Sequence, residues 1–212
     1  MSDLSAARHA MVESQLRARG ITDPRVLDAM LRVPREEFVP EGYRRYAYDD
    51  GPLPIGNGQT ISQPYVVAVM LEALQLSGTE KVLEIGTGSG YVTALLGELA
   101  AEVFSIERYA DLAENAWQVL AHLGYSNVRV ITGDGTLGLP DAAPFDAILV
   151  SAAAYGVPRA LLEQLAEGGR MMIPVGTHDG QQLQLIRMVG GQPVVSVREA
   201  VRFVPLIQDV SA

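Results

Sequence analysis

Lys81-Val82-Leu83-Glu84-Ile85-Gly86-Thr87-Gly88-Ser89-Gly90-Tyr91 is the stretch of this sequence that decides the fold. Its first five residues predict a buried strand and Tyr91 begins a predicted helix, so the glycines between them must form a tight turn. Glycines at alternate positions let a ligand lie directly against main-chain amides. The spacing is G-x-G-x-G, whereas dinucleotide folds use G-x-G-x-x-G to aim a helix N-terminus at a pyrophosphate. With Glu84 inside the strand, the shorter loop suits a ligand that carries a cation.

From this stretch onward, strand and helix patterns alternate, which is typical of a parallel sheet with helices on both faces. Gly190-Gly191 marks a hairpin between the last two strands, so an antiparallel pair should close the sheet. The sequence therefore predicts an α/β, Rossmann-like, doubly wound and mostly parallel seven-stranded sheet. Strands are expected at 82–85, 103–106, 128–131, 147–150, 170–173, 183–188 and 194–203, and helices at 90–99, 110–122 and 158–166.

The N-terminal part predicts two helices followed by a long aperiodic loop. One helix spans 6–19, with Gly20 placed to end it, and a second begins at Asp23-Pro24, an N-cap followed by proline. Five Gly and Pro residues between Asp49 and Gln63 argue that neither helix nor strand runs through that segment. Loops of this length are usually functional or disordered, and we expect an ordered binding loop; a linker packed against the sheet is the alternative.

A further helix is expected from Pro64, capped by Ser62 or Gln63. These elements predict a single domain, in which residues 1–64 supply N-terminal helices and a substrate loop and residues 65–212 supply a ligand-binding α/β core.

Composition restricts the function classes. The 212 residues contain 16 basic and 25 acidic side chains, a net charge of −9, which makes a nucleic acid an unfavourable partner. The absence of cysteine excludes disulfides and thiolate metal sites and is compatible with a reducing compartment. No apolar run approaches the roughly 18 residues of a membrane-spanning helix, and the N-terminus lacks the order of a signal peptide. We expect a soluble cytoplasmic protein without membrane contact, and a monomer.

The residues at successive strand ends predict the ligand, because ligands of open parallel sheets bind outside the carboxyl ends of the strands. Glu107 follows Gly86 by 21 residues, a spacing at which an acid receives a ribose hydroxyl pair. Asp134, between two glycines, could accept from an adenine amino group, and Ser151 begins a run of small residues that leaves room for a cosubstrate. Together with Glu84 these residues describe a site for S-adenosylmethionine. NAD would prefer the longer glycine spacing, and the G-x-x-x-x-G-K-[ST] loop for ATP is absent.

A second stretch identifies a family. Gly51-Pro52-Leu53-Pro54-Ile55-Gly56-Asn57-Gly58-Gln59-Thr60-Ile61-Ser62-Gln63-Pro64 resembles the signature loop of the protein-L-isoaspartate(D-aspartate) O-methyltransferase family. The resemblance covers about residues 11–207. Further matching segments are 82–91, 133–135, 145–153, 161–165, 168–176 and 202–206. The glycine loop is shared by many methyltransferases, whereas the 58–64 segment is close to diagnostic.

The resemblance implies a methyltransferase fold and S-adenosylmethionine as methyl donor, with S-adenosylhomocysteine as product. Its substrates would be damaged proteins or peptides, methylated on the free carboxylate of L-isoaspartyl and D-aspartyl residues to initiate repair through a succinimide. By position, Ser62 would be the catalytic residue. Substrate binding would involve Thr60, Ile61, Gln63, Val204, Pro205 and Leu206, and cofactor binding would involve Glu84, Gly86, Thr87, Gly88, Gly90, Glu107, Asp134 and Gly135. The sequence departs from many relatives at Ser151, where they have Thr, and at Tyr155-Gly156, where a proline-containing turn is common.

The chemistry of this reaction agrees with a site that has no metal and no histidine motif. A carboxylate has a reference pKa near 4, so it is ionised at neutral pH and needs no general base. The leaving group is a neutral thioether and needs no general acid. Two alternatives remain at this stage: a methyltransferase acting on a small molecule or RNA, and a non-catalytic nucleoside-binding module whose 49–63 loop recruits a partner protein.

Overall fold

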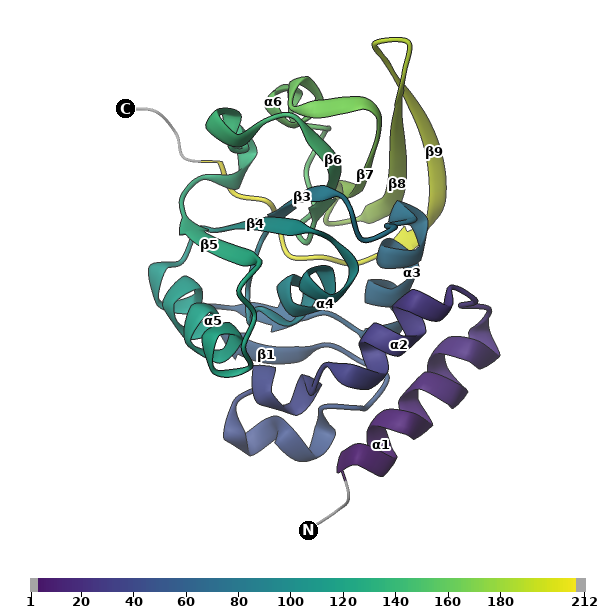
Figure 1. Cartoon of the computed structure of the whole chain (residues 1–212), viewed down its shortest axis with the longest axis vertical. Helices are drawn as coiled ribbons and strands as arrows, with labels where there is room; N and C mark the ends of the chain where they lie inside the picture. Colours follow the sequence, from purple (N-terminus) through teal and green to yellow (C-terminus); the bar gives the residue numbers. More distant parts are fainter. Residues whose placement is uncertain (1–3, 209–212) are drawn as a thin grey trace.

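A seven-stranded sheet organises the chain in the computed structural model, which describes residues 4–208 (Figure 1). Its strand order is β5-β4-β3-β6-β7-β8-β9, with β3 to β7 parallel and the last two pairings antiparallel. The strands are β3 (Lys81–Ile85), β4 (Glu102–Glu107), β5 (Val128–Thr132), β6 (Phe145–Val150), β7 (Leu165–Thr177), β8 (Gly180–Val189) and β9 (Gln192–Val201). The predicted fold class is thus confirmed.

The chain reverses direction across the sheet at β3. From β3 it builds outward through β4 to β5 and then returns to place β6 on the other side of β3. The carboxyl ends of β3, β4 and β6 therefore diverge around one crevice, the usual ligand position in such sheets. The glycine turn that follows Ile85 lies at this point.

Each face of the sheet has its own apolar core because alternate strand residues point to opposite faces. Val82 and Val103 join a core with the N-terminal helices, whereas Leu83 and Phe104 join the other. Figure 1 shows α3 (Pro64–Leu74), α4 (Tyr91–Leu99) and α5 (Ala110–His122) on one side and α6 (Arg159–Glu163) on the other. Among residues 4–208 no helix is long and apolar enough to cross a membrane.

The helix predicted at 158–166 is shorter than expected. α6 ends at Glu163, and β7 begins at Leu165, which pairs with Phe145 of β6. The Phe145 amide donates to the carbonyl oxygen of Gln164 at 2.9 Å, so backbone pairing with the sheet ends the helix before its sequence pattern does. Tertiary pairing overrides local helix preference here.

The N-terminal segment packs outside α3 and α4 as two helices. α1 (Leu4–Met11) continues through a π turn and a 3₁₀ turn to Gly20, whose φ of 94° ends the helical run. α2 (Pro24–Arg32) begins as predicted, with the Asp23 side chain accepting from the amide of Arg25. Two 3₁₀ turns follow, at Arg35–Phe38 and Glu41–Tyr46.

The prediction that no strand runs through 49–63 was wrong. β1 (Leu53–Gly56) and β2 (Gln59–Ile61) form an antiparallel hairpin. Asn57 and Gly58 make its two-residue turn with φ of 50° and 70°, and Asn-Gly is a strong hairpin signal. The Asn57 amide also donates to both carboxylate oxygens of Asp111 at 2.8 and 2.9 Å, which fastens the hairpin to α5. The loop is ordered, but as a hairpin.

The expected cap of α3 is also absent. Gln63 is the N-cap residue, and its side chain makes no capping hydrogen bond; it donates to the carboxylate of Asp50 at 2.7 Å. Pro64 at the first position of the helix has no amide to satisfy, which reduces the need for a cap.

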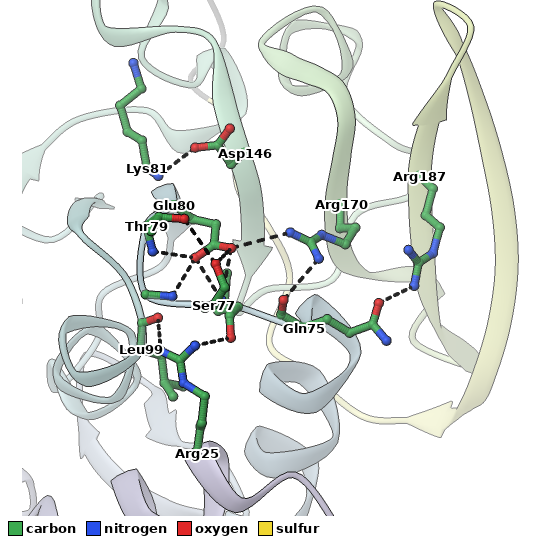
Figure 2. Close-up of polar contacts among 12 residues, drawn as sticks. Arg25, Gln75, Ser77, Thr79, Glu80, Lys81, Leu99, Asp146, Arg170 and Arg187 are labelled. Atoms are coloured by element: carbon green, nitrogen blue, oxygen red, sulfur yellow. Dashed lines mark hydrogen bonds and ion pairs between the residues drawn. The ribbon is translucent and has the colours of Figure 1, made fainter.

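Glu80 organises the turn that enters β3 (Figure 2). This turn precedes Lys81, whereas the glycine loop follows Ile85, so the two lie at opposite ends of the strand. Its buried carboxylate accepts from the amides of Ser77, Gly78 and Thr79 and from the Ser77 hydroxyl, at 2.7 to 3.1 Å. Burial alone would raise the pKa of Glu80, but these hydrogen bonds lower it to about 2. The Arg170 guanidinium lies 3.9 Å away.

Replacing Glu80 by Gln should therefore destabilise the fold in a pH-dependent way. Because the folded-state pKa lies below the ordinary value, the ionised carboxylate stabilises the fold above about pH 4.5, and this contribution is lost as pH falls toward 2. We expect Glu80→Gln to lower the free energy of unfolding by about 2 kcal/mol at pH 7 and by about half as much at pH 3. Urea denaturation at both pH values measures this, with Glu13→Gln, which removes an exposed ion pair, as the control. An equal loss at both pH values would contradict the assignment.

Candidate active site

A cleft opens at the carboxyl ends of β3, β4 and β6, beneath the β1–β2 hairpin. Its walls come from β2, the glycine loop, the strand ends and the C-terminal segment 204–207. That segment is fixed to the end of β6, because the amide of Ala153 donates to Val204 and the amide of Leu206 donates to Ala153. The predicted site residues that line this cleft are Thr60, Ile61, Ser62, Gly86, Thr87, Gly88, Glu107, Gly135, Val204, Pro205 and Leu206.

The glycine loop takes a backbone shape that other residues adopt with strain. Gly86, Gly88 and Gly90 have φ of 91°, 54° and 88°. A Cβ on Gly88 would lie 3.2 Å from Ile55 of the hairpin, so the loop and the hairpin meet closely. Gly90 does not line the cleft; a Cβ there would lie 3.1 Å from Ala116, so this glycine permits α5 to pack against the loop.

Glu107 holds the glycine loop and faces the cleft. Its buried carboxylate accepts from the amide of Gly88 at 2.8 Å through Oε2 and from the amide of Tyr109 at 3.0 Å through Oε1. A carboxylate has about four acceptor positions, so both oxygens keep capacity for further donors. The predicted ribose hydroxyls are donors of the required kind.

Glu84 is fully buried and does not line the cleft. Its Oε2 accepts from the hydroxyls of Thr93 at 2.5 Å and Ser105 at 2.6 Å. Burial raises the pKa of Glu84 to about 8, and the negative charge of Glu107 adds to this, while the two hydroxyls oppose it. The carboxyl is therefore largely protonated at neutral pH, and its predicted contact with a cationic cofactor stays a prediction.

Asp134 and Gly135 follow β5 at the edge of the cleft, and only Gly135 lines it. The Asp134 carboxylate accepts from the amide and hydroxyl of Thr136 at 2.9 and 2.7 Å, so it caps the 3₁₀ turn at Gly135–Leu137. Gly135 lines the cleft, and a Cβ on it would lie 2.4 Å from Ile85. Asp134 itself does not line the cleft, and its proposed contact with adenine is not tested by this geometry.

A second groove joins the cleft at Ser62. Thr60, Ser62, Ser151 and Val204 line both, and the groove continues along β9 and the residues after it, past Phe203. Gln63 lines this groove and not the cleft. Ser62 thus lies where the cleft and the groove meet.

Sequence reasoning missed several cleft residues. Tyr91, the first residue of α4, and Tyr109, two residues after Glu107, both line the cleft. Gln59 and Arg108 do so as well. Their positions immediately after a glycine turn, after a strand-end acid and in an Asn-Gly hairpin were the available signals.

A sequence model of the protein-L-isoaspartate(D-aspartate) O-methyltransferase family matches residues 6–211. The chain belongs to this family. A protein-L-isoaspartate O-methyltransferase from Koribacter versatilis (strain Ellin345) is 58% identical over 200 residues, which are 94% of this chain and 90% of the relative.

Solved structures agree with this assignment. A protein-L-isoaspartate O-methyltransferase matches with a TM-score of 0.85 at 31% identity, over 93% of this chain and 65% of the solved chain, just under two thirds of its length. A Plasmodium falciparum protein described as a protein-L-isoaspartate O-methyltransferase, in complex with S-adenosyl-L-homocysteine, matches with a TM-score of 0.83 at 27% identity, over 94% of this chain and 98% of that chain.

Membership of this family makes the chain an S-adenosylmethionine-dependent protein carboxyl O-methyltransferase that acts on isoaspartyl residues. The family and the cofactor predicted from the two sequence stretches are confirmed. Of the alternatives, neither the small-molecule or RNA methyltransferase nor the non-catalytic module agrees with this finding. The acceptor capacity of Glu107 and the bare glycine backbone fit S-adenosylmethionine.

The raised pKa of Glu84 predicts how stability changes with pH. The folded state keeps the Glu84 proton up to about pH 8, whereas the unfolded state loses it near pH 4.5, so stability from this group falls as pH rises between these values. Glu84→Gln should remove this fall, which is on the order of 1 kcal/mol per pH unit. Urea denaturation at pH 5 and pH 8, with exposed Glu114→Gln as control, should show the Gln variant gaining on the native protein as pH rises. Parallel behaviour at both pH values would contradict a protonated Glu84.

Proposed function

We propose that Ser62 orients the free carboxylate of an isoaspartyl or D-aspartyl residue for methylation, while the glycine loop and Glu107 hold the methyl donor. The observation that supports this proposal is that Ser62 lines both the cleft and the groove. A serine hydroxyl can donate a hydrogen bond to one carboxylate oxygen and leave the other free. Ser62 acts by orientation and forms no covalent bond.

The chemistry of the two reactants determines what the protein itself must supply. S-adenosylmethionine, when bound, supplies a methyl carbon on a positively charged sulfur. The acceptor carboxylate is already ionised, so the chain need not remove a proton. What the chain provides is position, which can contribute up to roughly 7 to 11 kcal/mol when reacting atoms are held in line. Thr60, Ile61 and the segment Val204–Leu206 would hold the peptide backbone on either side.

The methyl ester can form a succinimide, and then aspartate, without further catalysis. The carbonyl carbon of a methyl ester is a better electrophile than that of an ionised carboxylate. The nitrogen of the next backbone amide attacks this carbon, the bond to the methoxy group breaks, methanol leaves with the amide proton, and a succinimide ring forms. Water then opens the ring, and some of the product is normal aspartate. No side chain of this protein is needed for these later steps, so the enzyme would release the methyl ester.

The setting of this activity also belongs to the proposal. The net charge of −9 supports protein rather than nucleic-acid substrates, and the absence of cysteine supports a reducing compartment such as the cytoplasm. We further propose that the chain forms a single domain, since one apolar core joins the N-terminal helices to the sheet, and that it acts as a monomer.

Ser62→Ala should lower kcat/KM for an isoaspartyl peptide by ten- to a hundredfold, because the acceptor loses one orienting hydrogen bond. The affinity for S-adenosylhomocysteine should stay within about twofold. Single-turnover methyl transfer and calorimetric titration measure the two quantities, and exposed Ser126→Ala serves as the control. The same peptide with ordinary aspartate should not be methylated. Loss of cofactor affinity together with activity, or equal methylation of both peptides, would refute this role.

A further inference from the structure

Arg35 is a fully buried charged residue. Within residues 4–208 it forms no ion pair, and its neighbour Glu36 is engaged by Arg8 at 3.0 Å and by the Tyr48 hydroxyl. Burial lowers the pKa of the Arg35 guanidinium, although Tyr91 and Tyr48 oppose the shift. Burying a charge without an ionic partner costs free energy unless hydrogen bonds compensate it, so the contacts of this guanidinium show what the residue does.

The Arg35 guanidinium joins three segments that are distant in sequence. Nε donates to the carbonyl oxygen of Ala47 at 2.7 Å, and Nη2 donates to the carbonyl oxygen of Ser62 at 2.9 Å. Its Cζ lies 4.8 Å from the ring centre of Tyr91. The planar guanidinium of an arginine can make both hydrogen bonds and a ring contact at once, whereas the ammonium group of a lysine cannot reproduce that geometry.

Two of these three segments form the active site. Ser62 lines the cleft and the groove, and Tyr91 lines the cleft directly after the glycine loop. Arg35 itself lines neither. Ser62 also lies between the end of β2 and the start of α3, where no strand or helix ladder fixes its backbone. The side chain of Arg35 thus links the backbone of Ser62 to Tyr91, the residue directly after the glycine loop.

We propose that Arg35 is a positioning residue for methyl transfer, which acts by holding the Ser62 carbonyl so that the Ser62 hydroxyl faces the cleft. This inference rests on the role proposed above for Ser62. It assigns Arg35 no contact with either substrate, and it predicts that the effect of Arg35 on catalysis depends on the Ser62 hydroxyl being present.

Arg25 offers a matched control. Its guanidinium also donates to two backbone carbonyls, those of Leu76 at 2.9 Å and Leu99 at 3.2 Å (Figure 2). Leu76 and Leu99 precede β3 and β4, whose carboxyl ends line the cleft, so these contacts lie at the other end of the two strands. Arg25→Lys thus removes the same kind of interaction far from the active site.

A double-mutant cycle tests the inference. kcat/KM for an isoaspartyl peptide is measured for the native protein, Arg35→Lys, Ser62→Ala and the double variant, well below each melting temperature. We expect Arg35→Lys to lower kcat/KM at least tenfold in the native background and less than threefold in the Ser62→Ala background. S-adenosylhomocysteine affinity should stay within threefold, and Arg25→Lys should keep kcat/KM within twofold although its melting temperature falls.

Each other outcome would overturn the inference. Equal factors in both backgrounds would show that Arg35 does not act through Ser62, and a native kcat/KM in Arg35→Lys would show that it does not act at all. Failure of both Arg35→Lys and Arg35→Gln to fold, while Arg25→Lys folds, would assign Arg35 to stability. A native kcat/KM in Ser62→Ala alone would instead refute the role of Ser62, which distinguishes the two failures.

Discussion

The hydrogen bond from the Gly88 amide to the Glu107 carboxylate, 2.8 Å long, is the interaction on which the site depends. It joins the turn after β3 to the end of β4, so these two neighbouring strands together determine the shape of the glycine loop. The loop needs positive φ at three glycines, and the carboxylate holds it in that shape. The same carboxylate keeps acceptor capacity on the cleft side, so one group fixes the loop and offers a contact to the ligand.

The β1–β2 hairpin leads into Ser62, which we propose binds the methyl-accepting carboxylate, and places it beside the glycine loop. Ile55 packs against Gly88, and Asn57 holds the carboxylate of Asp111, so the hairpin is attached both to the glycine loop and to α5. Ser62 follows the hairpin directly, and its carbonyl oxygen accepts a hydrogen bond from Arg35. Methyl transfer between two bound molecules requires their sites to keep a fixed separation, and these contacts supply that constraint.

Much of the fold could be predicted from the sequence because buried parallel strands are short apolar runs with glycine turns at their ends. β3, β4, β5 and β6 were predicted within a residue or two. The β1–β2 hairpin contradicts the rule that proline and glycine break strands, because its prolines and glycines lie in a two-stranded edge and the Asn57-Gly58 turn joins the two strands. The early end of α6 could not be predicted, since it depends on the pairing of Leu165 with Phe145, a contact that local sequence does not encode.

The site was predictable to a different degree. Acids and glycines at strand ends identified Glu107 and Gly135, because the topology brings those ends together. Two other residues could not be placed from the sequence because both are fully buried. The carboxyl of Glu84 accepts from two hydroxyls and does not line the cleft, and Arg35 lies in a helical turn outside any motif. The roles of such residues depend on which side chains they contact in space, and the hydrophobic periodicity of the sequence does not reveal those contacts.

The most direct test of the account is a crystal structure of this protein with S-adenosylhomocysteine. The account predicts the ribose hydroxyls within hydrogen-bonding distance of Glu107, the nucleoside against Gly86 and Gly88, and the sulfur facing the Ser62 hydroxyl across the junction of cleft and groove. A ribose held elsewhere, or a sulfur turned away from Ser62, would contradict it.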